Sequence, residues 1–389
     1  MTEPVSLSSA QRFYLDLVRA SAAMMVLFGH AAHFFWPQSF MARGWLQGLG
    51  VYLFFLISGF LISFSVFEKR DDPNYGFRSY FIDRLCRIYS AFLPALIFVA
   101  LLDALSVDSP FYAWRRDYNL QTWIGNLFML QDFPAFQVLR RLGVPDNQWF
   151  IAPFGTARPF WTISIEWWIY MLFGGIVLVW LRRGRLGRGA MLALGFAAIE
   201  PAYHFVGGYD ECLTLLWIAG MGASLLFWNL PALARRWPAL DGRRLHRAAL
   251  IVAAAAAVSI IGRLFSNRSE LLEFQIGLFI GVLLFALLIA LGFVQNRIPR
   301  IVVRLVGFIA GYSYSLYLTH HTLLEFLAIR FGDRHGSAAM FWLVVIAANG
   351  LAMVFWVLFE RHYKRLARSL KDRLARREPV LSRPRLTAI

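Results

Sequence analysis

The sequence predicts an all-α, polytopic membrane protein with about ten transmembrane helices in one bundle. Of its 389 residues, 59% are hydrophobic and 16% are charged, whereas a soluble domain is about 45–50% apolar and about 25% charged. Its mean hydropathy is +0.55. A single water-soluble core cannot bury this much apolar surface, and the same composition excludes a disordered chain.

Ten apolar segments follow one another, and most have the length of about 20 residues that a membrane-spanning helix needs. They lie near residues 13–36, 45–67, 88–105, 161–181, 190–206, 212–228, 248–262, 274–294, 305–329 and 338–359. The seventh is short. It lies between Arg247 and Arg263, whose side chains can extend toward the membrane surfaces.

Basic residues predict the orientation. The net charge is +16, from 39 Lys and Arg against 23 Asp and Glu. If the N-terminus is cytoplasmic and the segments alternate, most of the basic residues fall on the cytoplasmic side, as the positive-inside rule requires. We therefore expect both termini in the cytoplasm. The same rule explains the basicity without nucleic acid, because no basic segment is combined with a nucleic-acid motif. Cys86 and Cys212 would lie on opposite sides of the membrane and would not pair.

Two segments lie outside the predicted spans. Residues 106–160 are expected to form an extracytoplasmic loop of the membrane-embedded domain, residues 1–360. Within the loop, Asn119–Gln131 is apolar but too short to span and predicts an interfacial helix. Aromatic residues crowd its end, and they are typical of an interface belt or of stacking on sugar faces: Trp149, Phe150, Phe154, Phe160 and Trp161. Residues 361–389 predict a basic cytoplasmic tail that begins as a helix against anionic lipid.

Ionisable residues inside a spanning helix are costly, so each is a functional candidate. Arg19 and His30 lie in the first segment, in RASAAMMVLFGH. Eleven steps of ~100° bring His30 back to nearly the same helix face, ~16 Å further along. A guanidinium suits a phosphate, and a neutral His can accept a proton from a hydroxyl. The structural alternative is an Arg that reaches the inner surface and a His hydrogen-bonded within the bundle.

Three further segments carry polar residues. Arg84 and Arg87 share a helix face and suit a phosphorylated cytosolic ligand, although the positive-inside bias also explains them. Glu166, in WTISIEWWIY, is suited to pair with an Arg, orient a His or accept a substrate hydroxyl, or it forms a structural ion pair. In YSYSLYLTHHTLLE, three- and four-residue steps place Tyr317 and His320 on one broad face.

Signatures of common chemistries are missing: the sequence has no GxSxG, no P-loop and no HExxH. A metal site built from His30, His33, His320 and His321 is disfavoured, because the usual carboxylate or Cys partners are not evident. We therefore expect no metal and no permanently bound cofactor.

Taken in order, these fragments resemble the acyltransferase-3 family of integral membrane acyltransferases over most of residues 13–360. The matching features are Arg19-x10-His30, the glycine-rich GVYLFFLISGFLI, the pair Arg84 and Arg87, WTISIEWWIY with Trp161 and Glu166 in register, and SYSLYLTHH with His320 at the His. Departures are Tyr52 in place of a frequent acid, Ser90 in place of a Pro, Trp167 in place of a second acid, and Thr319 in place of a Trp. They bear on acceptor specificity.

The resemblance implies an O-acyltransferase that moves an acyl group, often acetyl, from cytosolic acyl-CoA to a hydroxyl of a cell-surface or secreted glycan or glycolipid. Arg19, Arg84 and Arg87 would bind the donor phosphates. His30 would be the general base or a transient acyl carrier, with Glu166 and His320 as further catalytic residues and Trp161 and Tyr317 as substrate-binding residues. The expected location is the bacterial cytoplasmic (inner) membrane.

The sequence leaves other functions open. Ten helices with buried charge also suit a transporter or flippase of a lipid-linked sugar, and a glycan-binding scaffold without chemistry is a third hypothesis. An unrelated membrane O-acyltransferase fold with its own buried His is disfavoured by Arg19-x10-His30. The acceptor, the acyl chain and the oligomeric state are not predicted.

Overall fold

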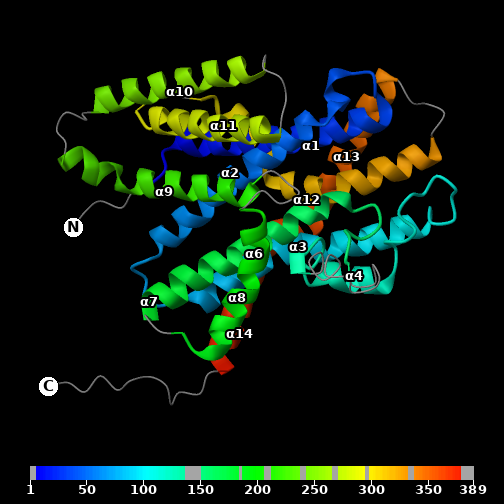
Figure 1. Cartoon of the computed structure of the whole chain (residues 1–389), viewed down its shortest axis with the longest axis horizontal. Coiled ribbons are helices and arrows are strands. Elements are labelled where there is room, and N and C mark those ends of the chain that lie inside the picture. The colour runs from blue at the N-terminus through cyan, green and yellow to red at the C-terminus, as the bar shows by residue number, and fades with distance from the viewer. Residues whose placement is uncertain are drawn as a thin grey trace.

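A computed structural model of the chain describes residues 6–135, 150–183, 186–205, 212–236, 242–264, 270–293, 298–331 and 337–377. Every regular element in these ranges is a helix (Figure 1). The long helices are α1 (Ser9–Phe35), α2 (Trp45–Glu68), α3 (Phe77–Ala104), α6 (Trp161–Gly175), α8 (Arg188–Tyr203), α9 (Leu213–Arg236), α10 (Gly242–Leu264), α11 (Glu270–Leu291), α12 (Arg300–Arg330) and α13 (Ala338–Leu358). The shorter ones are η1 (Phe40–Arg43), α4 (Leu120–Leu127), η2 (Arg158–Phe160), the π-helical η3 (Ile176–Trp180), α7 (Leu181–Arg183), η5 (Glu360–His362) and α14 (Tyr363–Arg377).

The predicted all-α, polytopic fold is confirmed. Each of the ten apolar segments lies largely within a helix. Among the described residues, eight helices are long and apolar enough to cross a membrane. The other two are α8, with 16 residues, and α11, whose apolar part is Gln275–Leu291. The count of ten crossings therefore stays a prediction.

Two helix boundaries differ from those expected. The third segment was placed at 88–105, but α3 begins at Phe77, because Tyr80, Ile82 and Cys86 are buried against neighbouring helices. Arg84 and Arg87 consequently lie within α3. The seventh segment was predicted too short, at 248–262, since α10 runs from Gly242 to Leu264 and carries exposed arginines in its first turns.

Helix α1 packs against α2, α12 and α13 (Figure 1). Its first turn is closed by a capping box, in which Ser8 Oγ accepts from the Gln11 amide at 3.2 Å and Gln11 Oε1 accepts from the Ser8 amide at 2.9 Å. Gln11 Nε2 also donates to the Leu288 carbonyl at 2.9 Å, which joins the start of α1 to the end of α11. At the opposite end of the bundle, Arg330, the last residue of α12, donates to the carbonyl of Leu105, which follows α3, at 2.7 Å. These end contacts fit helices that alternate in direction.

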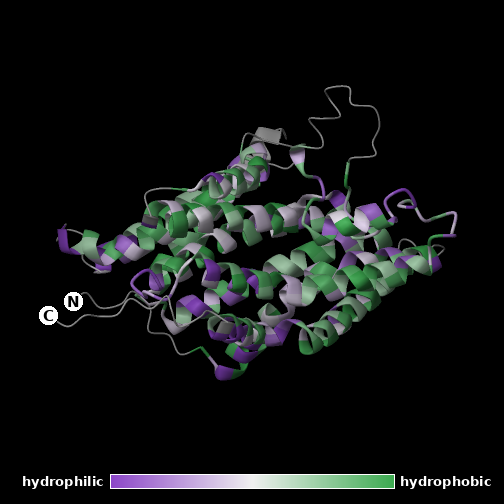
Figure 2. Cartoon of the chain, turned by 90° about the horizontal axis from the view of Figure 1, so that it is seen from below, coloured by the Kyte–Doolittle hydropathy of each residue, from purple (hydrophilic) through white to green (hydrophobic). Residues whose placement is uncertain are grey.

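Apolar side chains cover the outside of the bundle. Figure 2 shows long hydrophobic stretches along the helices. Ile251 and Val258 of α10 are each 69% exposed, and Ile346 of α13 is 68% exposed. Apolar groups at these positions face the surroundings, as the hydrocarbon interior of a membrane allows.

The loop of residues 106–160 contains a helix where one was expected, although α4 is shorter than the predicted Asn119–Gln131. Asn119 Oδ1 caps it by accepting from the Thr122 amide at 2.9 Å. Both interpretations of the aromatic cluster are wrong for Phe154 and Phe160, which are 3% and 0% exposed in the core. Their rings contact Tyr118 and Phe92. Trp149 lies outside the described residues.

The described part of the predicted basic tail (residues 361–389) is residues 361–377, and it packs against the bundle. Helix α14 packs on α3, where Ala367 forms a buried cluster with Ile82 and Cys86. Lys371 Nζ donates to Asp83 Oδ1 at 2.6 Å. Ala367, Leu370 and Leu374 of this amphipathic helix therefore pack against protein, because α3 presents an apolar face to them, whereas Leu366 is 52% exposed.

Helices α2 and α9 cross at two glycines that lie against each other's backbones. A Cβ on Gly59 would come within 2.0 Å of the Trp217 carbonyl oxygen, and one on Gly220 within 2.1 Å of the Leu56 carbonyl oxygen. Close approach of this kind is how small residues allow transmembrane helices to pack. The crossing holds Phe60 of α2 against Phe227 of α9, with ring centroids 5.9 Å apart.

Gly220→Ala is expected to destabilise the protein by about 1–3 kcal/mol, because the added methyl group forces the two helix backbones apart. The matched control is Gly222→Ala on the same helix, where a Cβ meets no atom within 4 Å and the change improves helix propensity. Thermal unfolding of the detergent-solubilised protein measures both. Equal midpoints for the two variants would contradict the role of the crossing.

Candidate active site

Three histidines from two helices meet in the bundle. His30 Nδ1 of α1 lies 2.9 Å from His320 Nε2 of α12, and the two rings are stacked with centroids 5.1 Å apart. The ring of His321 meets His30 edge-on, also at 5.1 Å. His320 is 1% exposed. The structure thus brings together two residues that lie 290 positions apart in the sequence.

Backbone carbonyls determine the tautomers of this pair. His320 Nδ1 lies 2.9 Å from the Leu316 and Tyr317 carbonyl oxygens. Because a carbonyl only accepts, Nδ1 of a neutral His320 carries the hydrogen, and its Nε2 then accepts from His30 Nδ1–H. The lone pair of a neutral His30 is consequently on Nε2. This arrangement orients His30 with an unprotonated nitrogen left for a substrate.

The half of the bundle that contains the C-terminal ends of α1 and α12, here called the outer half, holds a cavity of about 360 Å³ beside His30. Its wall also includes Gln47, Asp132, Arg158, Trp161 and Tyr317. Gln47 Oε1 is buried and has no hydrogen-bond partner among the described residues. An unpaired buried acceptor is costly, so this oxygen is suited to a donor from a ligand. The lining mixes an aromatic ring with hydrogen-bonding groups, as polar organic ligands require.

One wall of this outer cavity is positioned by Asp103 at the end of α3. Its carboxylate accepts from the Thr156 amide at 2.8 Å, from Thr156 Oγ1 at 2.7 Å and from the Tyr112 hydroxyl at 2.9 Å. Burial and the Asp103 carboxylate raise the pKa of Tyr112, which keeps this hydroxyl a donor. The Thr156 carbonyl in turn accepts from His321 Nδ1 at 2.8 Å. Gly155, with φ +51°, lies against Asp103, where a Cβ would come within 2.0 Å of Oδ2.

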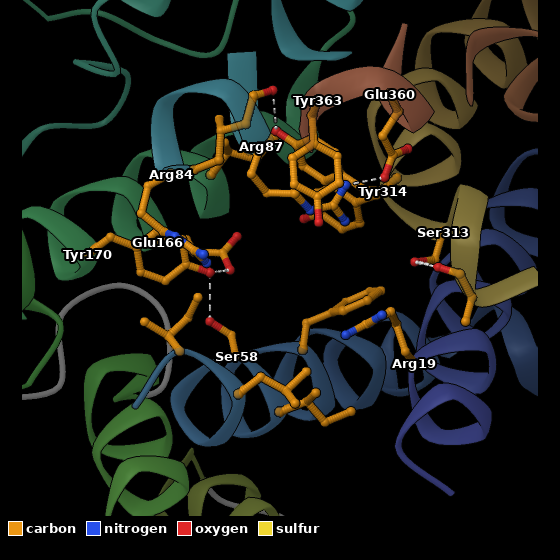
Figure 3. Close-up of a pocket in the computed structure, with 18 of the residues that line it drawn as sticks. Arg19, Ser58, Arg84, Arg87, Glu166, Tyr170, Ser313, Tyr314, Glu360 and Tyr363 are labelled. Carbon is orange, nitrogen blue, oxygen red and sulfur yellow. Dashed lines mark hydrogen bonds and ion pairs between the residues drawn. The ribbon is translucent and has the colours of Figure 1, made fainter. Parts of the chain in front are cut away.

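The inner half of the bundle holds a larger cavity of about 520 Å³ (Figure 3). Arg19 of α1 and Arg84 and Arg87 of α3 all line it. Figure 3 shows the three arginines arranged around the same space. Arg84 Nε is buried and has no partner among the described residues. A cavity with several guanidinium groups suits a phosphorylated ligand, because each guanidinium binds phosphate with directed hydrogen bonds.

Arg87 is held by a buried carboxylate that sequence reasoning missed. It forms an ion pair with Glu360, which is 1% exposed. Glu360 Oε2 also accepts from the Ser315 amide at 3.0 Å and from Ser315 Oγ at 2.6 Å. The rings of Tyr314 and Tyr363 lie 5.3 and 5.0 Å from the Arg87 guanidinium. Glu360 lay at the end of the last apolar segment, where nothing in the sequence distinguished it from a surface residue.

Glu166 lines the inner cavity and does not line the one that contains His30. It accepts from the Tyr170 hydroxyl, which lies 2.8 Å from Ser58 Oγ (Figure 3). Among the roles considered for Glu166, orienting His30 does not fit this placement. The reason is that α6 runs inward from Trp161, so Glu166 lies deeper in the bundle, on the side of the arginines.

The two cavities meet at Tyr317 and Val51, which line both. The Tyr317 hydroxyl lies 2.6 Å from Thr162 Oγ1 and donates to the Pro159 carbonyl at 3.1 Å. Its ring also contacts Phe54 at 5.8 Å and His320 at 5.9 Å. Tyr317, which was predicted from its position on one helix face with His320, thus lies between the arginine cavity and the histidines.

The structure accordingly divides the predicted residues between two places. The outer cavity is lined by His30, Trp161 and Tyr317, with His320 directly behind His30. The inner cavity is lined by Arg19, Arg84, Arg87, Glu166 and Tyr317. No group of three or more His, Cys, Asp or Glu among the described residues is arranged to hold a metal ion.

A family model described as an acyltransferase domain matches residues 12–361. The chain belongs to this acyltransferase family. It is also similar to nodulation protein 10 from Rhizobium leguminosarum bv. viciae, with 25% identity over 393 residues. The matched region covers 94% of this chain and 97% of that protein. No solved structure matches it. The protein is therefore a multi-pass membrane acyltransferase, which decides against a pure transporter and against a scaffold without chemistry.

Glu360→Gln is expected to destabilise this acyltransferase by about 1–3 kcal/mol, because Arg87 loses its charged partner in a buried setting. Asp71→Asn is the control, since Asp71 is 89% exposed in its pair with Arg70, and such exposed changes are usually within about 0.5 kcal/mol. Thermal unfolding in detergent measures both variants. A Glu360→Gln protein as stable as Asp71→Asn would contradict the structural role of the ion pair.

Proposed function

We propose that this acyltransferase moves an acyl group from cytosolic acyl-CoA to a hydroxyl of a cell-surface or secreted glycan or glycolipid, and that this acyl group is acetyl. The observation that supports this proposal most directly is the pair of cavities: a cationic one in the inner half of the bundle and a histidine-lined one in the outer half, meeting at Tyr317 and Val51.

The distance between the proposed phosphate-binding residues and the catalytic base suits an acyl-CoA. Arg19 and His30 lie eleven residues apart on α1, which corresponds to ~16 Å along the helix. An extended pantetheine arm spans ~20 Å by chain-reach arithmetic. With its phosphates at Arg19, Arg84 and Arg87, the arm would pass Tyr317 and Val51 and bring the thioester to His30.

His30 Nε2 would take the proton from the acceptor hydroxyl as the hydroxyl oxygen attacks the thioester carbon. The new carbon–oxygen bond forms, the carbon–sulfur bond breaks, and the proton passes from His30 to the leaving thiolate. His320 would act as a positioning residue, because its hydrogen bond fixes which nitrogen of His30 is free. A transient acyl group on His30 is the alternative route to the same products.

Acceptor binding would use the outer cavity. Trp161 offers an aromatic face for a sugar ring, and Gln47 and Asp132 offer amide and carboxylate oxygens for its hydroxyls. Glu166 would act on the donor side instead, since it lies among the arginines of the inner cavity. A cytosolic donor and a surface acceptor place the protein in the bacterial cytoplasmic membrane, with both termini inside.

His30→Ala is expected to reduce acyl transfer at least 100-fold, because general-base catalysis contributes about 10²–10⁴ in rate. The measurement is transfer of radiolabelled acetyl from acetyl-CoA to surface glycan by the purified protein in lipid. His33→Ala, an exposed position one turn along α1, is the control and should retain activity. Full activity of the His30 variant would remove this residue from the mechanism.

Arg19→Ala is expected to raise the KM for acetyl-CoA about 10–100-fold with a smaller change in kcat, because Arg19 acts in binding the donor phosphates. Arg12→Ala, an exposed arginine in the first turn of the same helix, should leave KM unchanged. Initial rates over a range of donor concentrations separate the two parameters. An unchanged KM in the Arg19 variant would count against a phosphate at this position.

A further inference from the structure

The C-terminal segment contributes side chains to the inner cavity. Its lining includes Arg361, Tyr363 and Lys364 from η5 and α14, beyond the residues that the sequence predicted. Figure 3 shows Tyr363 beside Arg87 at this cavity. These residues belong to the stretch that was expected to be a tail outside the membrane domain. The structure makes its first turn a wall of the cavity.

Helix α14 is held on α3 by apolar packing and by an ion pair. Its apolar residues Ala367, Leu370 and Leu374 pack against Ile82 and Cys86 of α3. Lys371 pairs with Asp83 at 2.6 Å, and Asp83 lies directly before Arg84 and one turn before Arg87 on the same helix. Because α3 also carries two of the cavity's arginines, docking α14 on α3 fixes the position of Arg361 and Lys364 relative to them.

The cations of the cavity lie at different depths. Arg19, Arg84 and Arg87 are half-buried, whereas Arg361 and Lys364 are exposed. Arg87 is paired with Glu360 and Arg19 lies 3.6 Å from Asp16. In the part of the chain that the structure describes, neither Arg361 nor Lys364 has an acidic partner. Two uncompensated cations therefore stand at the solvent end of the cavity.

We propose that α14 forms the nucleotide end of the donor site, where Arg361 and Lys364 bind the 3′-phosphate of the CoA adenosine. This inference rests on the proposed function. In CoA the diphosphate joins the pantetheine arm directly, whereas the 3′-phosphate lies on the ribose at the far end. If the arm runs from the inner cavity toward His30 in the outer half, the diphosphate meets the half-buried arginines, and the 3′-phosphate meets the exposed pair.

The test compares CoA with dephospho-CoA, which differs only in lacking the 3′-phosphate. Binding of each is measured by calorimetry to the full-length protein in lipid nanodiscs, so that the result does not depend on turnover. Wild type is expected to bind CoA at least tenfold more tightly than dephospho-CoA. In Arg361→Gln/Lys364→Gln that preference is expected to vanish, through weaker binding of CoA with unchanged binding of dephospho-CoA.

The control Arg373→Gln/Arg376→Gln removes the same charge from exposed positions further along α14, away from the cavity. It should keep the preference of wild type. Equal loss of affinity for both ligands in the Arg361/Lys364 variant, or an unchanged preference, would overturn the assignment. If wild type binds both equally, the inference fails while the donor proposal stands. If it binds neither, the proposed donor fails as well.

Discussion

Polar side chains placed within a membrane must find partners inside the protein, and the rest of this structure follows from that constraint. Water is absent from the hydrocarbon region, so an unpaired charge or hydrogen-bonding group there is costly. The polar residues of α1, α3, α6 and α12 therefore turn toward a common interior, while apolar residues such as Ile251 and Ile346 face outward. The two cavities are the spaces that these inward-facing polar residues enclose.

Each end of this interior has its own chemistry because different pairs of helices supply it. At the inner end, Glu360 neutralises Arg87 and leaves other guanidinium groups around an open space. At the outer end, carbonyls of α12 set the tautomer of His320 and through it that of His30. Tyr317 belongs to both, which places a single side chain between a site that suits phosphate and a site that suits proton transfer.

The outer end also depends on parts of the chain without a membrane span. Asp103 binds Thr156, and Thr156 binds His321, so the loop that carries Thr156 is tied to the histidine helix. A change in that loop is thereby coupled to the geometry around His30. At the inner end, α14 has the corresponding role, since it is docked on the helix that carries Arg84 and Arg87.

The all-helical membrane fold, nearly all of the helices and the family could be predicted from the sequence, because each depends on local composition and on short motifs such as Arg19-x10-His30. The sequence also singled out His30, His320 and the three arginines. The three-dimensional structure was needed to learn that His30 and His320 share a hydrogen bond, that Glu166 lies with the arginines, and that Glu360 and α14 belong to the inner cavity. These are contacts between segments up to 290 positions apart, and the packing of helices, which no local pattern encodes, brings them together.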